Sequence, residues 1–156
     1  MLSFTFYRTI HLDCPVFIWR YTMEEQKIKV LALLPMELPK EIELDNTLEA
    51  MQNFVGGLIE CITLSDTGSE VTLVCNDEGK YNGMRPCRAI YGEGREMMDI
   101  IFGPFFICDC STPYFGSLNK EQLERYTKQF QNPERFFRVG GEIKAVPYKP
   151  EKDHER

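Results

Sequence analysis

Residues Met97–Cys108 read MMDIIFGPFFIC and form the most apolar segment of the chain. Gly103-Pro104 lies inside this segment, and proline has no N–H group to donate to a neighbouring strand. The pair therefore indicates one of two arrangements. Either a bulge or bend keeps the segment at the edge of a sheet, or the segment splits into two strands.

Further strands are expected before this segment, where short apolar or alternating runs are separated by turn residues. The four runs are Lys27–Leu34, Glu41–Leu44, Leu58–Leu64 and Glu70–Cys75. The turn residues Asp66-Thr67-Gly68 separate the last two runs, which are therefore expected to form a hairpin.

A first helix is expected between the second and third of these runs. Asp45 or Asn46 is the expected N-cap, and Glu49 follows Asn46 at the spacing of a capping box. Apolar residues then recur at helical spacing until Gly56-Gly57, which is typical of a helix C-terminus.

A second helix is expected near the C-terminus. Asn119 is the expected N-cap and Gln122 the residue that reaches back to it, and Asn132-Pro133 ends the helix. Strands, a helix, more strands and a final helix predict an α+β fold. It is expected to be a single domain with a largely antiparallel β-sheet and two packed helices.

The globular domain is expected to span residues 27–138. Residues 1–26 are interpreted as an N-terminal extension, which is either an added hairpin or not native at all. In the second case translation starts at Met23 rather than at Met1. Residues 139–156 are charged and are expected to be a mobile tail.

The composition excludes several classes of function. The chain of 156 residues has 18 Lys and Arg against 24 Asp and Glu, a net charge of −6. This balance disfavours direct DNA binding, because a nucleic-acid binder neutralises phosphates with a basic surface. The only histidines, His11 and His154, lie near the termini. Catalytic triads need a positioned imidazole, so no enzymatic activity, catalytic residue or cofactor is predicted.

Six cysteines are scattered along the chain, mostly inside apolar runs, and are expected to be reduced and buried. They are Cys14, Cys61, Cys75, Cys87, Cys108 and Cys110. The Cys108-Asp109-Cys110 step lacks the paired spacing of a structural zinc site, so no metal is predicted. No apolar run approaches the ~20 residues of a membrane span, and no signal peptide is recognised. The predicted location is the cytoplasm.

The segment from Cys75 to Tyr91, CNDEGKYNGMRPCRAIY, carries the candidate binding residues. These are Lys80, Tyr81, Arg85, Arg88 and Tyr91. Arginines beside aromatic rings can form a platform for anions or stacked bases. The alternative is a hairpin with an irregular turn, whose cations neutralise Asp77, Glu78 and Glu93.

Three runs give the chain a resemblance to a known family: VCNDEGK, GMRPCRAIY and DIIFGPFFIC. From Lys27 to Phe137 it resembles an uncharacterised family of small domains of unknown function. That family is carried by phages, plasmids and integrative elements of Gram-positive bacteria. The family pattern usually has Asn where this chain has Cys87, whereas Pro86, Arg88 and Tyr91 match the pattern.

The resemblance implies a setting among the accessory genes of mobile elements, where small acidic proteins antagonise host defence. The leading hypothesis is a non-enzymatic binding protein of a phage or mobile element. It would act on a host protein as a defence antagonist, anti-CRISPR-like or similar, or as a regulator. Net charge −6 favours a partner with a basic surface, such as a nucleic-acid-binding defence protein. The alternative is a protein that binds or sequesters a nucleotide or a nucleotide second messenger.

Overall fold

A computed structural model describes residues 27–66 and 69–150. Its centre is a five-stranded sheet with the strand order β2-β1-β7-β4-β3, in which all neighbours are antiparallel. The strands are β1 (Lys27–Leu33), β2 (Lys40–Asp45), β3 (Ile59–Asp66), β4 (Ser69–Asn76) and β7 (Phe105–Asp109). The expected extension of residues 1–26, and with it the choice between Met1 and Met23, lies outside the described residues.

The apolar segment that contains Gly103-Pro104 splits into two strands. β6 (Met97–Phe102) ends before Gly103, which has a φ of 82°, and β7 begins after Pro104. The prediction of a split is confirmed, whereas the alternative of a continuous edge segment is wrong. β7 is the central strand of the sheet, and Phe105–Cys108 are buried. Pro104 lies in the break and removes no hydrogen bond from the ladder.

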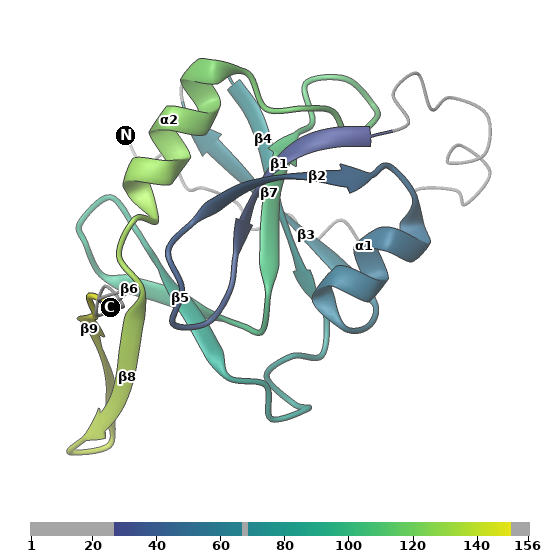
Figure 1. Ribbon diagram of the computed structural model, residues 1–156. Helices are drawn as coiled ribbons and strands as arrows, with labels where there is room; N and C mark the ends of the chain where they lie inside the picture. Colours follow the sequence, from purple (N-terminus) through teal and green to yellow (C-terminus); the bar gives the residue numbers. More distant parts are fainter. Residues whose placement is uncertain (1–26, 67–68, 151–156) are drawn as a thin grey trace, which may run out of the picture.

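The first helix, α1 (Leu48–Val55), covers one face of the sheet (Figure 1). Met51 and Val55 on this helix pack with Ile28, Val30 and Phe106 of the sheet. These apolar contacts are the main reason why α1 docks on the sheet, since burying each large side chain contributes roughly 1.5–3 kcal/mol.

The N-cap of α1 is Thr47, so the prediction of Asp45 or Asn46 is wrong. The Thr47 side chain accepts a hydrogen bond of 3.1 Å from the N–H of Ala50. Asn46 is buried instead and donates a hydrogen bond of 3.3 Å from Nδ2 to the carbonyl of Phe115. This long-range bond diverts the Asn46 amide from the helix end, and Thr47 is the next residue able to cap.

The opposite face of the sheet is covered by α2 (Lys120–Gln129) and by the hairpin of β5 (Pro86–Tyr91) and β6. The predicted capping box is confirmed. Asn119 accepts from the Gln122 N–H at 2.8 Å, and the Gln122 side chain accepts from the Asn119 N–H at 2.9 Å. The sheet thus lies between two apolar layers, as predicted for an α+β domain with two packed helices, although strands predominate.

A third hairpin follows α2 and projects from the body at the lower left of Figure 1. It consists of β8 (Glu134–Val139) and β9 (Glu142–Pro147), paired in antiparallel register. Sequence analysis assigned residues 139–156 to a mobile tail and did not predict β9. The turn is formed by Gly140 and Gly141, which have φ values of 60° and 86° that glycine adopts readily. Among the described residues, neither helix has the length and apolar character needed to cross a membrane.

Candidate functional site

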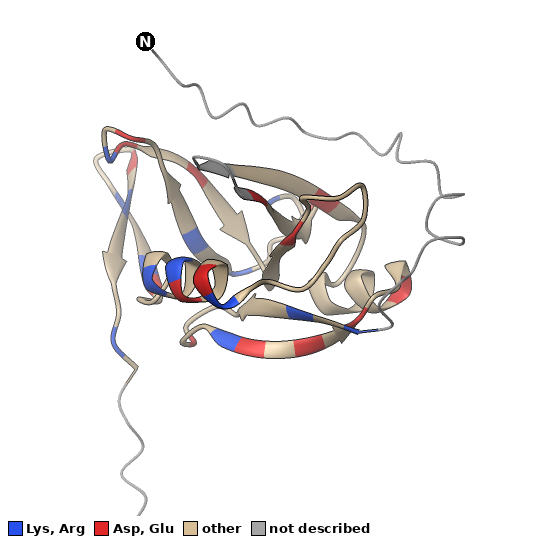
Figure 2. Ribbon diagram, turned by 90° about the horizontal axis from the view of Figure 1, so that it is seen from above, with Lys and Arg blue, Asp and Glu red and all other residues tan. Residues whose placement is uncertain are grey.

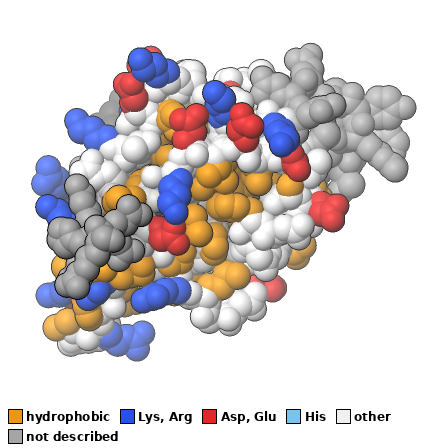
Figure 3. Space-filling view, viewed as in Figure 1, with side chains coloured by type: hydrophobic (Ala, Val, Ile, Leu, Met, Phe, Trp, Pro, Cys, Tyr) orange, Lys and Arg blue, Asp and Glu red, His pale blue; other side chains and the backbone are white. Residues whose placement is uncertain are grey.

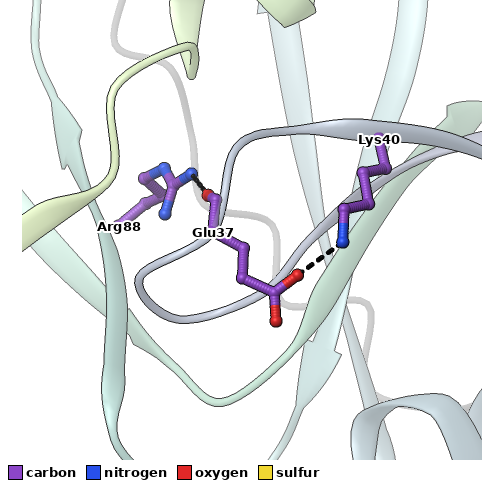
Figure 4. A network of polar contacts seen from close by, with 3 residues as sticks. All are labelled: Glu37, Lys40 and Arg88. Carbon is purple, nitrogen blue, oxygen red and sulfur yellow. Dashed lines mark hydrogen bonds and ion pairs between the residues drawn. The ribbon is translucent and has the colours of Figure 1, made fainter. Parts of the chain in front are cut away.

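Arg88 on β5 is the most completely buried of the predicted site residues, with 0% of its surface exposed. Its guanidinium donates three hydrogen bonds to backbone carbonyl oxygens: from Nε to Phe130 at 3.2 Å, from Nη1 to Cys87 at 3.0 Å and from Nη2 to Glu37 at 2.7 Å. Figure 4 shows the last of these. The side chain thereby joins β5 to the end of α2 and to the loop between β1 and β2.

Burial lowers the pKa of the Arg88 guanidinium from its ordinary value, while the neighbouring Cys87 and Glu134 act in the opposite direction. The guanidinium donors already face carbonyl oxygens. Sequence analysis expected Arg88 on an exposed platform; the structure instead puts it inside the core, where a ligand reaches it only if the core opens. The arginine therefore holds the surrounding segments together. Its planar guanidinium has several N–H donors in a fixed geometry, which suits it to this role.

The loop pinned by Arg88, residues 34–39, has an unusual conformation. Met36 has a φ of 66°, a region that non-glycine residues seldom occupy. Glu37 forms an ion pair of 2.6 Å with Lys40, also drawn in Figure 4, and Leu38 is exposed. The hydrogen bond from Arg88 to the Glu37 carbonyl holds this loop against the body.

Tyr91, at the end of β5, is tied to Glu134. Its hydroxyl donates a hydrogen bond of 2.7 Å to Oε2 of Glu134, whose Oε1 accepts from the Ala89 N–H at 3.0 Å. Burial, and then the hydrogen bond and charge of Glu134, raise the pKa of Tyr91 from 10.0 to about 12. Glu134 is buried and is the first residue of β8, so its two hydrogen bonds anchor the start of β8 to β5.

Sequence analysis missed Glu134. Its only local signal is that a carboxylate follows Asn132-Pro133 at the end of the last helix. Its partners Ala89 and Tyr91 are more than 40 residues away along the chain.

The other three predicted residues lie on the loop between β4 and β5, called here the β4–β5 loop (residues 77–85). Lys80 Nζ lies 3.4 Å from Oδ1 of Asp99 and 5.8 Å from the ring centre of Phe102. Tyr81 is 87% exposed, the most exposed large hydrophobic residue that the structure describes. Arg85 is exposed, and its carbonyl accepts from the Gly103 N–H at 2.8 Å.

The β4–β5 loop is braced on both sides. Asn76 donates from Nδ2 to the Val55 carbonyl of α1 at 3.2 Å and accepts from the Glu78 N–H at 2.8 Å. Gly79 packs so closely on β6 that a Cβ there would lie 2.7 Å from the Phe102 carbonyl oxygen. The side chain of Met84 packs on Gly103. The run VCNDEGK thus builds a fixed turn that carries Tyr81 at its surface.

The five predicted residues therefore do not form one platform. Lys80, Tyr81 and Arg85 share the β4–β5 loop, whereas Arg88 is internal and Tyr91 is bound to Glu134. The alternative of a hairpin with an irregular turn is right for the turn and wrong for the hairpin, because β4 and β5 belong to different sheets. An ion pair does form at this turn, between Lys80 and Asp99. That carboxylate was not among those proposed.

The five described cysteines are free thiols. Burial raises the pKa of Cys87 to about 12 and that of Cys110 to about 11, and it raises the pKa of the fully buried Cys108 well above 9.0. These thiols are therefore held protonated and unreactive at neutral pH. Within residues 27–66 and 69–150, no three His, Cys, Asp or Glu side chains are grouped as a metal site.

Comparison with known proteins gives one match. The model of a protein family described as a domain of unknown function, DUF3846, matches residues 28–131. This range includes the sheet, both helices and the β4–β5 loop, and it ends before β8. No curated protein and no solved structure matches the chain.

Proposed function

Because the chain belongs to the DUF3846 family, whose description assigns no activity, we propose a function from its surface: it is a non-enzymatic protein that binds another protein through the β4–β5 loop. The observation that carries this proposal is the 87% exposure of Tyr81 on a braced loop. Tyr, Trp and Arg are the residues that most often dominate the energy of protein interfaces.

The bracing of the loop is the second element of the argument. Binding costs free energy when a flexible loop has to be ordered, and a preorganised loop avoids much of that cost. Asn76, Gly79 and Met84 fix the backbone on either side of Tyr81. A tyrosine ring also has few rotatable bonds, so it gives a large contact area at a low cost in entropy.

The charge of the body favours a partner with a basic surface. The β4–β5 loop itself is balanced, with Asp77 and Glu78 against Lys80 and Arg85, but the body, residues 27–133, has ten Lys and Arg against sixteen Asp and Glu. Opposite surface charge accelerates association and selects partners. We therefore propose a host protein as partner, such as a nucleic-acid-binding defence protein. In this proposal the chain acts in the bacterial cytoplasm on behalf of a phage or mobile element, as an antagonist or regulator.

The test is capture of a partner from a lysate of the bacterial host by the full chain. Tyr81→Ala is expected to reduce capture at least roughly tenfold, since an interface tyrosine commonly contributes ~2 kcal/mol or more. The matched control is Tyr114→Ala, because Tyr114 is a second exposed tyrosine on a different loop. Equal capture by wild type and Tyr81→Ala contradicts the proposal, as does the absence of any captured protein.

Two further measurements test the defence-antagonist role and the nucleotide-binding alternative. Protection of phage DNA against CRISPR nucleases, lost in Tyr81→Ala, supports the defence-antagonist role. Native mass spectrometry of the purified chain tests the nucleotide alternative, which now rests on Lys80, Tyr81 and Arg85 alone. A stoichiometric nucleotide in that spectrum favours the alternative over protein binding.

A further inference from the structure

The β8–β9 hairpin exposes an unusual amount of apolar surface for so small an element. Phe137, Val139, Ile143 and Val146 are each between 44% and 53% exposed. They are four of the ten exposed large hydrophobic side chains in the described part of the chain. Two-stranded ribbons are only marginally stable in water unless another surface covers them.

The hairpin also differs from the body in charge. Its exposed cations are Arg135, Arg138 and Lys144; Glu142 is exposed too, but Glu134 is buried against β5. In Figure 3 basic and hydrophobic side chains gather at the lower left, where Figure 1 draws the hairpin, and acidic side chains lie mainly at the top and right. Figure 2 likewise shows acidic residues on several elements of the body.

Strand alternation sorts the hairpin side chains into two faces. One face contains Glu134, the half-buried Phe136 and Ala145, and the exposed Arg138 and Ile143, and Glu134 directs it toward the body. The other face, called here the outer face, is made by the alternate positions of both strands. It carries Arg135, Phe137, Val139, Glu142, Lys144 and Val146.

We propose that the outer face of the β8–β9 hairpin is a self-association surface, and that it binds the acidic body of a second copy of this chain. The argument is charge complementarity within one sequence. The same chain carries an apolar ribbon edged with cations and a body with an excess of carboxylates, so two copies cover each other's ribbons. Repulsion between the two bodies is screened beyond a Debye length of ~8 Å at physiological salt, so short-range contacts decide.

A nucleic acid is the less suitable occupant of this face. The outer face has only two cations, Arg135 and Lys144, which gives weak binding to phosphates, since affinity and its salt dependence scale with the number of contacts. The aliphatic side chains of Val139 and Val146 also have no counterpart on a phosphate backbone. The self-association proposal does not involve the β4–β5 loop, so it can be tested separately from the proposed binding of a partner protein.

The test is sedimentation velocity of the full chain over a range of concentrations at low and at physiological salt. The wild type is expected to form a dimer or larger species that weakens as salt rises. Arg135→Glu/Lys144→Glu, which reverses both cations of the outer face, is expected to weaken association at least roughly tenfold, because attractive pairs become repulsive. Phe137→Ser/Val146→Ser, which keeps the charge, is expected to weaken it as well.

The matched control is Lys120→Glu/Lys128→Glu on α2, which changes the net charge by the same amount away from the hairpin. It is expected to associate like the wild type. Circular dichroism melting confirms that each variant is folded. The proposal is overturned if the wild type is monomeric at every concentration, or if the α2 variant dissociates as much as the hairpin variant. It is also overturned if an oligothymidine probe binds the hairpin of a monomeric chain.

Discussion

Nε of Arg88 donates a hydrogen bond of 3.2 Å to the carbonyl oxygen of Phe130, the C-cap residue of α2. The two residues are 42 positions apart, and the same guanidinium reaches the Glu37 carbonyl, 51 positions away in the other direction. One buried side chain thus satisfies carbonyl oxygens from α2, β5 and the loop between β1 and β2.

Arg88→Ala is expected to lower the free energy of unfolding by about 3–6 kcal/mol. It removes the guanidinium donor from three carbonyl oxygens, at ~1–3 kcal/mol for each buried group left unsatisfied, and it opens a cavity. Urea unfolding followed by circular dichroism measures the loss. Arg85→Ala is the control, since Arg85 is exposed, and its effect is expected to stay within ~0.5 kcal/mol. Equal stability of the two variants contradicts a structural role of Arg88.

The Tyr91 hydroxyl is expected to ionise with a pKa of about 12, because burial and Glu134 both favour the neutral phenol. Ultraviolet titration of the wild type against Tyr91→Phe measures this pKa. In Glu134→Gln the pKa of Tyr91 is expected to fall but to remain above 10.0, since burial is the larger cause. An unchanged pKa in that variant excludes the contribution of Glu134.

The same shift predicts the effect of alkaline pH on stability. Between about pH 10 and pH 12 the folded chain retains the Tyr91 proton while the unfolded chain has lost it. The contribution of Tyr91 to stability is therefore complete below pH 10 and declines as pH rises to about 12. Denaturant unfolding of the wild type and Tyr91→Phe at several pH values measures this decline. A pH dependence that is identical in both contradicts it.

Gly103→Ala is expected to be clearly more destabilising than Gly141→Ala. Both glycines have similar φ values, 82° and 86°, so the backbone strain of about 1 kcal/mol is shared. A Cβ at Gly103 would lie 2.6 Å from Sδ of Met84, whereas nothing lies within 4 Å of a Cβ at Gly141. The difference between the two unfolding free energies isolates the packing of Met84. Equal losses in the two variants show that Met84 moves aside without cost.

The buried thiols are expected to resist modification. In a Cys14→Ser background at pH 8, Cys108 should react with a disulfide reagent at least roughly 100-fold more slowly in the folded than in the unfolded chain. Mass spectrometry of labelled peptides follows each cysteine separately. Fast labelling of Cys108 in the folded chain means that the sheet opens readily around β7.

Local signals predicted the local features well. Asn119 and Gln122, which are three positions apart, form the predicted capping box. Gly103-Pro104 divides the apolar segment into β6 and β7. The cap of α1 was misassigned because Asn46 is engaged by Phe115, 69 positions away. The β8–β9 hairpin was missed because neither strand alternates cleanly between apolar and polar residues. Its exposed apolar side chains lie on both faces.

The candidate site shows the same division. Tyr81 and its loop follow from the run VCNDEGK, whose glycine and asparagine act on nearby backbone. The burial of Arg88 does not follow from its neighbours in sequence, because two of its three carbonyl partners come from distant segments. A side chain's role depends on where its partners lie, and pairings of that range are not encoded in a short motif.

The central position of β7 has a consequence for the order in which the chain assembles. The hairpins β1–β2 and β3–β4 can each form from nearby residues, but they are hydrogen-bonded into one sheet only by β7, which pairs with both. Ile107 lies opposite Leu31 and Leu73 at once. Contacts so far apart in sequence slow folding, and unpaired strand edges promote aggregation in the meantime. A chain still being synthesised, or interrupted before Phe105, therefore lacks the strand that joins these hairpins into one sheet, and the edges of β1 and β4 stay open.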